Sequence, residues 1–328
     1  MKVLFTIALS TLSLNAFSQY TPQAGVSGST AIHKSSPLFV NWATYCSLQR
    51  GWLDIAQPGL GLVSAGDSSL AIGAADNFVV SLGDSGVATL TFQHPVMNGP
   101  GADFAIFENG FPDPADPENA FLELAFVEVS SDGVNFFRFP SSSLTPTDTQ
   151  IAGAGVYMDA RNIDQLAGKY IGNYGTPFDL DVLSGTTGLD LNAITHIRII
   201  DVVGSIDKHS SRDAANNIIN DPYPTPFAVG GFDLDAVGVI HQNASNNVSA
   251  MAPSQFSVFP NPASDYLYIK SDRVLNYGLY SVTGTLLLQG TVNKETQLNI
   301  ASLSTGIYVL RLSNPENQMQ WSQRVSIQ

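Results

Sequence analysis

Apolar and polar residues alternate in short runs along most of the chain, a period-two pattern that is typical of β-strands. Residues 87–92 (VATLTF) and 195–200 (THIRII) alternate in this way. Residues 104–107 (FAIF) are instead apolar on both faces, which predicts a central strand covered on both sides. Residues 230–240 (GGFDLDAVGVI) predict the last strand of the same unit.

Turn residues divide these runs. In 124–140 (LAFVEVSSDGVNFFRFP) the pair Asp132-Gly133 falls between two apolar runs and predicts a hairpin, because glycine accepts the positive φ of a tight turn. A connection of nearly 30 residues, 204–231, precedes the last predicted strand. Connections of this length are uncommon in compact domains and are often functional.

The last quarter of the chain has a strand pattern of its own. Residues 241–255 are rich in Asn, Ser and Ala without apolar periodicity, which indicates a linker. From Phe256 onward, seven short apolar runs follow one another at close spacing. They predict a small antiparallel sandwich of immunoglobulin type. We therefore expect an all-β protein with a β-sandwich body over 19–243, a linker over 244–255 and a tail domain over 256–328.

The N-terminus carries an export signal. A lysine is followed by an apolar run from Val3 to Leu14, and Ala16 and Ser18 then form an A-x-S cleavage pattern. This arrangement predicts a secretory signal peptide over residues 1–18. No later stretch reaches about 18 apolar residues, so we expect no transmembrane segment.

The net charge and the cysteine content argue against nucleic-acid binding and against a disulfide bond within the chain. The formal net charge is −14, whereas binding of nucleic acid requires a basic surface, so we expect no nucleic-acid partner. Cys46 is the single cysteine and stands in an apolar setting, which predicts a buried side chain without a disulfide.

The tail carries three motifs in order: FPNPASDYLYI, LYSVTGTLLLQG and LNIASLSTGIYVLRLS. Together they resemble the C-terminal sorting domain of the type IX secretion system of Bacteroidetes. The resemblance covers about a quarter of the chain and rests on Pro260, Asn261, Pro262, Gly284 and Gly306. It implies an interaction with that secretion machinery, and a body that is attached to the outer cell surface or released.

The body resembles a family of uncharacterised secreted bacterial surface proteins, through GADFAIFENGF, AFVEVSSDGVNFFRFP and DPYPTPFAVGGFDLDAVGVI. VEVSSDGVNF, followed much later by GFDLDAV, is also similar to galactose-binding-like jelly rolls, the sandwich of many carbohydrate-binding modules. That resemblance implies a jelly-roll-like body that binds a ligand. Folds of this type serve many activities, so the ligand has to be argued from the site.

Acidic residues near two predicted strands suggest a cation site. Asp233 and Asp235 are two apart in a strand and so share a face, where two carboxylates repel unless something neutralises them. Ca²⁺ prefers oxygen ligands, and Glu108 and Asn109 follow the central strand. The jelly-roll resemblance also implies a structural Ca²⁺ that involves Glu108, Asp233 and Asp235, and we expect Asn109 to contribute. The alternative is that the aspartates bond backbone amides and a buried arginine such as Arg198.

Aromatic residues in predicted loops are candidates for ligand contact, because exposed rings stack on sugar rings. We single out Tyr223 and Phe227 in the long connection, together with Trp52 and Tyr174. The chain has no G-x-S-x-G, H-E-x-x-H or phosphate-binding loop motif, so we assign no catalytic residue and expect no enzyme. The leading function is glycan binding outside the cell. The alternatives are capture of a small nutrient, such as a corrinoid, for an outer-membrane receptor, and degradation of a polysaccharide.

Overall fold

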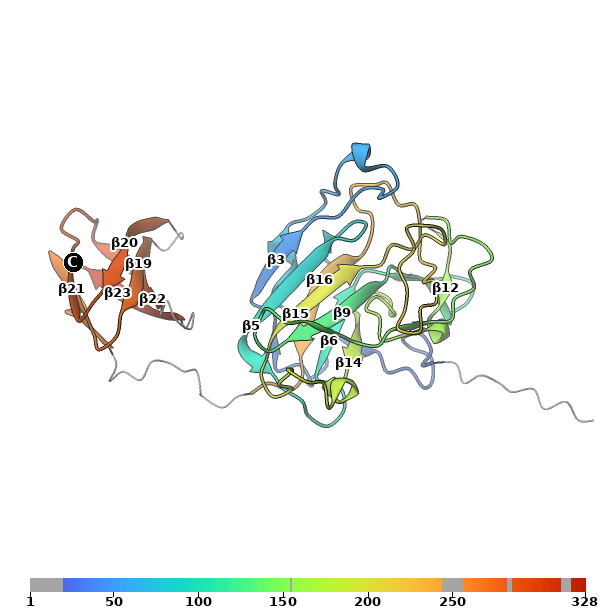
Figure 1. Cartoon of the computed structure of the whole chain (residues 1–328), viewed down its shortest axis with the longest axis horizontal. Helices are drawn as coiled ribbons and strands as arrows, with labels where there is room; N and C mark the ends of the chain where they lie inside the picture. The colour runs from blue at the N-terminus through green and yellow to red at the C-terminus, as the bar shows by residue number, and fades with distance from the viewer. Residues whose placement is uncertain (1–19, 154, 244–255, 282–284, 314–319) are drawn as a thin grey trace, which may run out of the picture. The chain divides into compact units, whose positions relative to one another are not determined.

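The structure is a computed structural model that describes residues 20–153, 155–243, 256–281, 285–313 and 320–328. It divides into two compact units at the boundary between Asn243 and Ala244 (Figure 1). The described residues of both units form antiparallel strands joined by turns, with four short 3₁₀ turns and no α-helix. The expected all-β architecture is therefore confirmed.

The first large sheet of the body has the central strand that the sequence predicts. Strand β6 (Phe104–Glu108) lies between β14 (Tyr174–Phe178) and β16 (Asp233–Val239), and all five of its residues are buried. The remaining strands of this sheet are β1 (Ile32–His33), β2 (Asn41–Trp42) and β4 (Val80–Ser81).

The second large sheet has β15 (Ile194–Asp201) at its centre, between β5 (Val87–Val96) and β9 (Ala125–Ser130). The predicted hairpin forms, since β10 (Phe137–Arg138) returns along β9 and Gly133 has φ +75° in the connecting turn. Strand β3 (Tyr45–Gln49) closes the other edge of the sheet.

The two sheets enclose one apolar core. Ile197 and Ile199 of β15 point into it together with Leu90 of β5, while Phe104 and Ile106 enter from β6. The opposite face of β6 is covered as well, because Phe107 packs against Phe39 and Trp42 at ring-centroid distances of 5.5 Å. This double coverage explains why β6 is apolar on both faces.

Smaller pairings extend the sandwich at one end. Strands β7 (Phe111–Pro112), β8 (Asn119–Phe121) and β12 (Met158–Asp159) form a three-stranded sheet, and β11 (Ser142–Ser143) pairs with β13 (Ile163–Asp164). A second buried cluster that includes Leu122 and Leu124 lies under these strands. The 3₁₀ turns are η1 (Pro58–Leu60), η2 (Ser68–Ala71), η3 (Ala160–Asn162) and η4 (Leu180–Leu183).

The tail forms all seven predicted strands. One sheet contains β17 (Phe256–Phe259), β18 (Tyr266–Ser271) and β21 (Glu295–Asn299). The other contains β19 (Leu275–Ser281), β20 (Leu286–Val292), β22 (Gly306–Ser313) and β23 (Gln320–Ile327). The tail has its own apolar core, which includes Leu267, Leu279 and Leu310.

The proline-flanked entry of the tail is tied to its last strand. The Asn261 side-chain amide donates to the carbonyl of Arg324 at 2.9 Å and accepts from the amide of Ser326 at 2.9 Å. Asn261 therefore bonds backbone, as asparagine in a turn often does, but the partner is a strand more than 60 residues away. Gly306 begins β22, and Gly284 lies outside the described residues.

Candidate functional site

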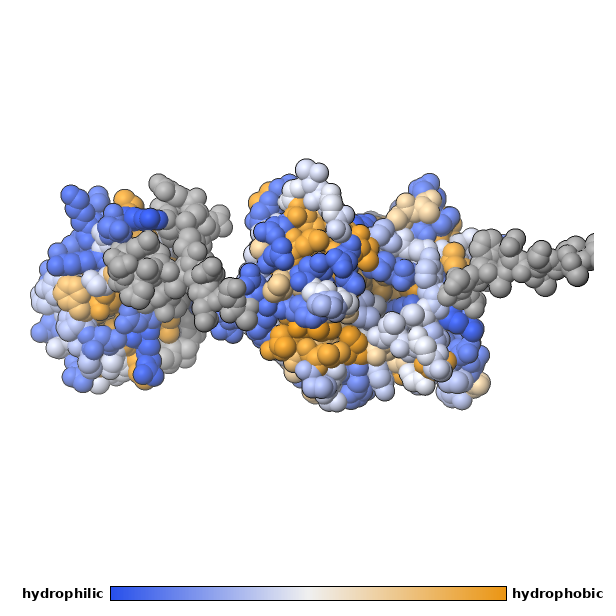
Figure 2. Space-filling view, turned by 90° about the horizontal axis from the view of Figure 1, so that it is seen from below, coloured by the Kyte–Doolittle hydropathy of each residue, from blue (hydrophilic) through white to orange (hydrophobic). Residues whose placement is uncertain are grey.

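A cavity of about 190 Å³ opens near the end of β6 and the start of β16. We call it the aromatic cavity, because three phenylalanines line it together with four polar side chains. Figure 2 shows hydrophobic residues gathered in patches among polar ones on one face of the body. The lining residues are Asn109, Phe111, Phe121, Glu123, Thr225, Phe227, Val229, Gly230 and Asp233.

The rings at this cavity come from two segments. Phe111 of β7 stacks on Phe121 of β8, with ring centroids 4.9 Å apart and an angle of 20° between the planes. Phe121 is buried, whereas Phe111 is 43% exposed and Phe227 is 55% exposed. Exposed rings beside a cavity provide apolar faces against which a ligand can stack.

The long connection supplies Phe227 on a tight turn. The amide of Phe227 donates to the carbonyl of Thr225 at 2.7 Å, and the amide of Gly230 donates to the carbonyl of Phe227 at 2.9 Å. A Cβ atom on Gly230 would stand 2.1 Å from the Thr225 carbonyl oxygen, so the turn leaves no space for a side chain there. This local geometry holds Phe227 beside the cavity.

The polar side of the cavity is built by two neighbouring strands. Leu234 of β16 pairs with Glu108 of β6, which places Asp233 beside Asn109. The Asp233 carboxylate accepts from the Ser81 hydroxyl at 2.5 Å and from the Asn109 side-chain amide at 3.1 Å. Burial is the main cause that raises the pKa of Asp233, to about 6.

Glu123 lies between β8 and β9 and lines the same cavity. Its side chain is 6% exposed and makes no hydrogen bond or ion pair with any residue that the structure describes. Burial raises the pKa of Glu123 well above its ordinary value, and the charges of Asp233 and Glu108 raise it further.

Glu108 is also buried, with an exposed fraction of 1%. Its Oε2 accepts from the amide of Gly110 at 2.8 Å, while its Oε1 is buried without a hydrogen-bond partner. Burial raises the pKa of Glu108 well above the usual range, and the charge of Asp233 acts in the same direction.

The four residues expected to bind Ca²⁺ are only partly brought together. Glu108, Asn109 and Asp233 lie close to one another, but Asp235 accepts from the amides of Asp76 at 3.1 Å and Asn77 at 3.2 Å. The pairing of β16 with β6 shifts register between Leu234 and Ala236, so the simple two-residue repeat is interrupted there.

The alternative, in which backbone amides satisfy these aspartates, describes Asp235 and not Asp233. Arg198 is not their partner, since it pairs with Glu128 and lies over the ring of Phe136. In the arrangement of the described side chains, no three His, Cys, Asp or Glu residues converge closely enough to hold a metal ion.

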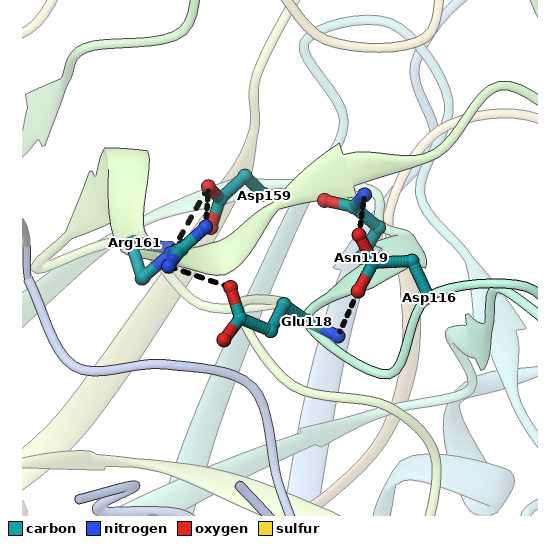
Figure 3. Close-up of polar contacts among 5 residues, drawn as sticks. All are labelled: Asp116, Glu118, Asn119, Asp159 and Arg161. Carbon is teal, nitrogen blue, oxygen red and sulfur yellow. Dashed lines mark hydrogen bonds and ion pairs between the residues drawn. The ribbon is translucent and has the colours of Figure 1, made fainter.

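Two acidic residues of the loop before β8 are bonded to neighbouring groups (Figure 3). Arg161 pairs with Glu118 at 2.5 Å and with Asp159 at 2.8 Å. Asp116 accepts from the amide of Glu118 at 3.0 Å and from the side chain of Asn119 at 3.1 Å. Glu118 is therefore paired with a cation from a neighbouring segment, whereas Asp116 is held by hydrogen bonds alone.

The structure places the other aromatic candidates away from the cavity. Tyr223 is 9% exposed and its hydroxyl donates to Asp54 at 2.8 Å, so its ring is not an exposed platform. Trp52 is 37% exposed and pairs with Leu62 and Asp84 through isolated bridges. Tyr174 is half-buried against His33 at a ring-centroid distance of 5.1 Å. Of the four, Phe227 alone lines the aromatic cavity.

Sequence reasoning missed several residues of the cavity, namely Phe111, Phe121, Glu123 and Thr225. For Glu123 a signal was present, because it interrupts the apolar run FLELAF as a lone acid between Leu122 and Leu124. A charged residue inside a buried run requires a partner or a function. Phe111 and Phe121 look like ordinary core residues in the sequence.

The comparison with solved structures gives low similarity over most of the chain. One match is PorZ, a surface component of the type IX secretion system of Porphyromonas gingivalis, with 12% identity, a TM-score of 0.22 and coverage of 82% of this chain and 47% of that chain. A second is a biofilm-associated protein BSP domain, with 8% identity, a TM-score of 0.20 and coverage of 89% and 52%. A third is a β-glucuronidase of Parabacteroides merdae, with 10% identity, a TM-score of 0.21 and coverage of 94% and 36%.

TM-scores this low establish neither a shared fold nor a shared function. The chain spans about half or less of the length of each of those structures. Among curated proteins, no sequence matches this chain. The described residues include no helix that is long and apolar enough to cross a membrane.

The tail has a specific match. Residues 257–328 match the family described as the secretion system C-terminal sorting domain. The match covers the seven-stranded tail and includes the prolines and Asn261 of its entry. The C-terminal quarter of this chain is therefore a sorting domain of the type IX secretion system, which exports the protein to the outer cell surface or releases it from the cell.

Proposed function

We propose that the exported body is a non-enzymatic binding module and that the aromatic cavity recognises a sugar ring of an extracellular glycan. The observation that carries this proposal is that one cavity holds exposed aromatic rings next to carboxylate and amide side chains. Sugars present apolar ring faces and hydroxyl groups together. The rings of Phe227 and Phe111 can stack on the apolar face of a sugar ring. The polar side chains of Asn109, Glu123 and Asp233 can form hydrogen bonds with its hydroxyl groups.

The size of the cavity favours a sugar ring over a corrinoid. Its volume is about 190 Å³, whereas pockets for drug-sized ligands have volumes of about 300–1,000 Å³. A corrinoid is larger than such ligands and would lie mostly outside the cavity. Capture of a small nutrient is therefore the weaker alternative, unless that nutrient is itself a sugar.

The test begins with a glycan array screened with the purified protein, residues 19–328, followed by calorimetry with the sugars that bind. Phe227→Ala removes an exposed ring, so we expect affinity to fall about tenfold while stability is unchanged. Phe78→Ala is the matched control, because Phe78 is 66% exposed and does not line the cavity. Equal affinity of the wild-type protein and Phe227→Ala for every bound sugar would contradict the proposal.

A second candidate is hydrolysis of a glycosidic bond. The observation that favours it is the presence of two carboxylates, Glu123 and Asp233, in the same cavity. Glycosidases use such a pair, one as the acid and the other as the base or nucleophile. Hydrolysis can be distinguished from binding by incubating the bound glycan with the wild-type protein and measuring new reducing ends. If the wild-type protein releases reducing ends and Glu123→Gln does not, the result would favour hydrolysis over binding alone.

A further inference from the structure

A second cavity of the body, of about 470 Å³, is lined by residues from two segments, 143–147 and 212–218. We call it the arginine groove, because Arg212 is the only charged residue in the described lining. It shares no lining residue with the aromatic cavity. Its volume lies within the range of about 300–1,000 Å³ that is typical of ligand pockets.

The carboxylate of Asp213 organises the segment that carries Arg212. It accepts from the main-chain amides of Ala215 at 3.0 Å and Asn217 at 2.8 Å, and these bonds close a tight turn. It also accepts from the amide of Ser143 at 3.1 Å, which ties the turn to the other segment of the groove. Amides therefore occupy the Asp213 carboxylate, and it forms no ion pair with Arg212.

The Arg212 guanidinium has unused hydrogen-bond donors. Its Nη1 donates to the carbonyl of Asn216 at 2.9 Å, whereas Nε and Nη2 bond no other residue that the structure describes. The ion pairs among the described residues do not include Arg212 either. Nε and Nη2 lie side by side in a planar group, so together they match the two oxygens of a carboxylate.

Other residues of the lining also carry unused polar groups. The main-chain amides of Thr145, Thr147 and Ile218 bond no other described residue. The hydroxyl groups of Ser143 and Thr145 are buried and have no hydrogen-bond partner in the part of the chain that is described. Buried polar groups usually have a partner, so a ligand that accepts hydrogen bonds would complete this lining.

We propose that the arginine groove binds an acidic sugar of an extracellular glycan, with the sugar carboxylate on Nε and Nη2 of Arg212. The described lining contains no Asp or Glu, so no lining side chain repels a carboxylate. Thr147 and Asn216 are exposed at the groove, and their hydroxyl and amide groups suit the hydroxyls of a sugar ring.

An acidic peptide is another ligand that presents carboxylates. Peptides are usually bound along a strand edge or in an apolar groove, whereas hydroxyl and amide side chains and one arginine supply most of this lining. The composition of the groove therefore favours a sugar. The formal net charge of the chain is −14, so the protein as a whole repels acidic ligands. Acceptance of such a sugar therefore depends on the local charge of Arg212.

Calorimetry with the purified protein, residues 19–328, tests this site. The probes are trisaccharides of galacturonic, glucuronic and mannuronic acid. Their neutral counterparts are trisaccharides of galactose, glucose and mannose, which carry a hydroxymethyl group in place of each carboxylate. We expect at least one acidic trisaccharide to bind, and Arg212→Gln to weaken that binding by about tenfold or more. The melting temperature should not change, because Arg212 is exposed and makes one hydrogen bond. Binding of a neutral trisaccharide should be the same in both proteins.

Lys208→Gln is the matched control, because it removes one exposed positive charge from the same connection but not from the groove. It should keep the wild-type affinity for the acidic trisaccharide. Phe227→Ala should keep it as well, since Phe227 lines the aromatic cavity and not the arginine groove. The groove is thus tested separately from glycan binding at the aromatic cavity.

Three results would overturn the proposal. The first is that no acidic trisaccharide binds, or that Arg212→Gln and Lys208→Gln lose affinity equally. The second is that Phe227→Ala loses the acidic trisaccharide while Arg212→Gln keeps it, which would place the acidic sugar in the aromatic cavity and leave the proposed function intact. The third is that tetraglutamate binds more tightly than every acidic trisaccharide and loses affinity in Arg212→Gln, which would make the groove a site for acidic peptides.

Discussion

The Asn109 side-chain amide donates a hydrogen bond to the Asp233 carboxylate, with 3.1 Å between Nδ2 and Oδ2. This bond joins the residue that follows β6 to the first residue of β16, so two neighbouring strands fix the polar side of the aromatic cavity. A rigid sheet therefore positions these two groups, while the long connection adds Phe227.

Replacement of Asn109 tests this relationship. Asn109→Ala removes a polar group of the cavity and the donor that holds Asp233, so we expect glycan affinity to fall about tenfold. Calorimetry with the sugar found on the array measures the change. Asn98→Ala is the control, because the Asn98 side chain bonds Asp181 and does not line the cavity. Equal losses in both variants would mean that the effect is not local.

The pH dependence of stability tests a different buried acid. Burial raises the pKa of Asp84 to about 6; the charge of Asp54 acts in the same direction, while a backbone hydrogen bond from Ile55 and the charge of His209 oppose it. The folded state therefore holds the Asp84 proton more tightly than the unfolded state does. This contribution to stability is complete below about pH 4 and is lost as the pH rises through about 6.

Asp84→Asn should remove that dependence. The amide keeps an oxygen that can accept from the amide of Ile55, and it carries no charge to desolvate. We expect the variant to gain on the order of 2 kcal/mol over the wild-type protein at pH 7, and little at pH 4. Urea unfolding at several pH values measures this. A constant difference between the two proteins across that range would be inconsistent with the assignment.

Cys46 should be chemically inert in the folded protein. The side chain is 5% exposed, and burial raises the pKa of its thiol to about 11, so little thiolate forms near neutral pH. A thiol-reactive dye should label the native protein much more slowly than the urea-unfolded protein. Comparable rates in the two states would show that the thiol is accessible and that our description of its environment is incorrect.

Asn261 should stabilise the sorting domain and support export. Its side chain makes two hydrogen bonds to β23, so Asn261→Ala should lower the free energy of unfolding of the tail by about 1 kcal/mol. The secreted fraction in the producing cell should fall with it. Gln297→Ala serves as the control, because Gln297 is exposed on β21. Unimpaired stability of Asn261→Ala would argue against this role.

The strands were predictable because burial of one face imposes a period of two on the sequence. The alternation of apolar and polar residues predicted β15 and β5. The apolar character of both faces of β6 predicted its central position. The tail was predictable for a second reason, since its motifs resemble one specific family.

The site was less predictable, because its residues meet only in the folded chain. Phe111 and Glu123 come from around β8, Phe227 from the long connection and Asp233 from the last strand of the body. Tyr223 and Phe227 are both aromatic residues of the long connection, so the sequence did not distinguish them. In the structure the Tyr223 side chain is buried and its hydroxyl bonds Asp54. Strand periodicity also suggested that Asp233 and Asp235 act together, and the register shift beside them interrupts that repeat.

A crystal structure of the protein grown with the sugar that binds most tightly on the array tests directly whether the aromatic cavity recognises glycans. We expect electron density for one sugar ring in van der Waals contact with Phe227 and Phe111, with hydroxyls within hydrogen-bonding distance of Asn109 or Asp233. A sugar ring bound elsewhere on the body, for example against Trp52, with the aromatic cavity unoccupied, would contradict glycan recognition at this cavity.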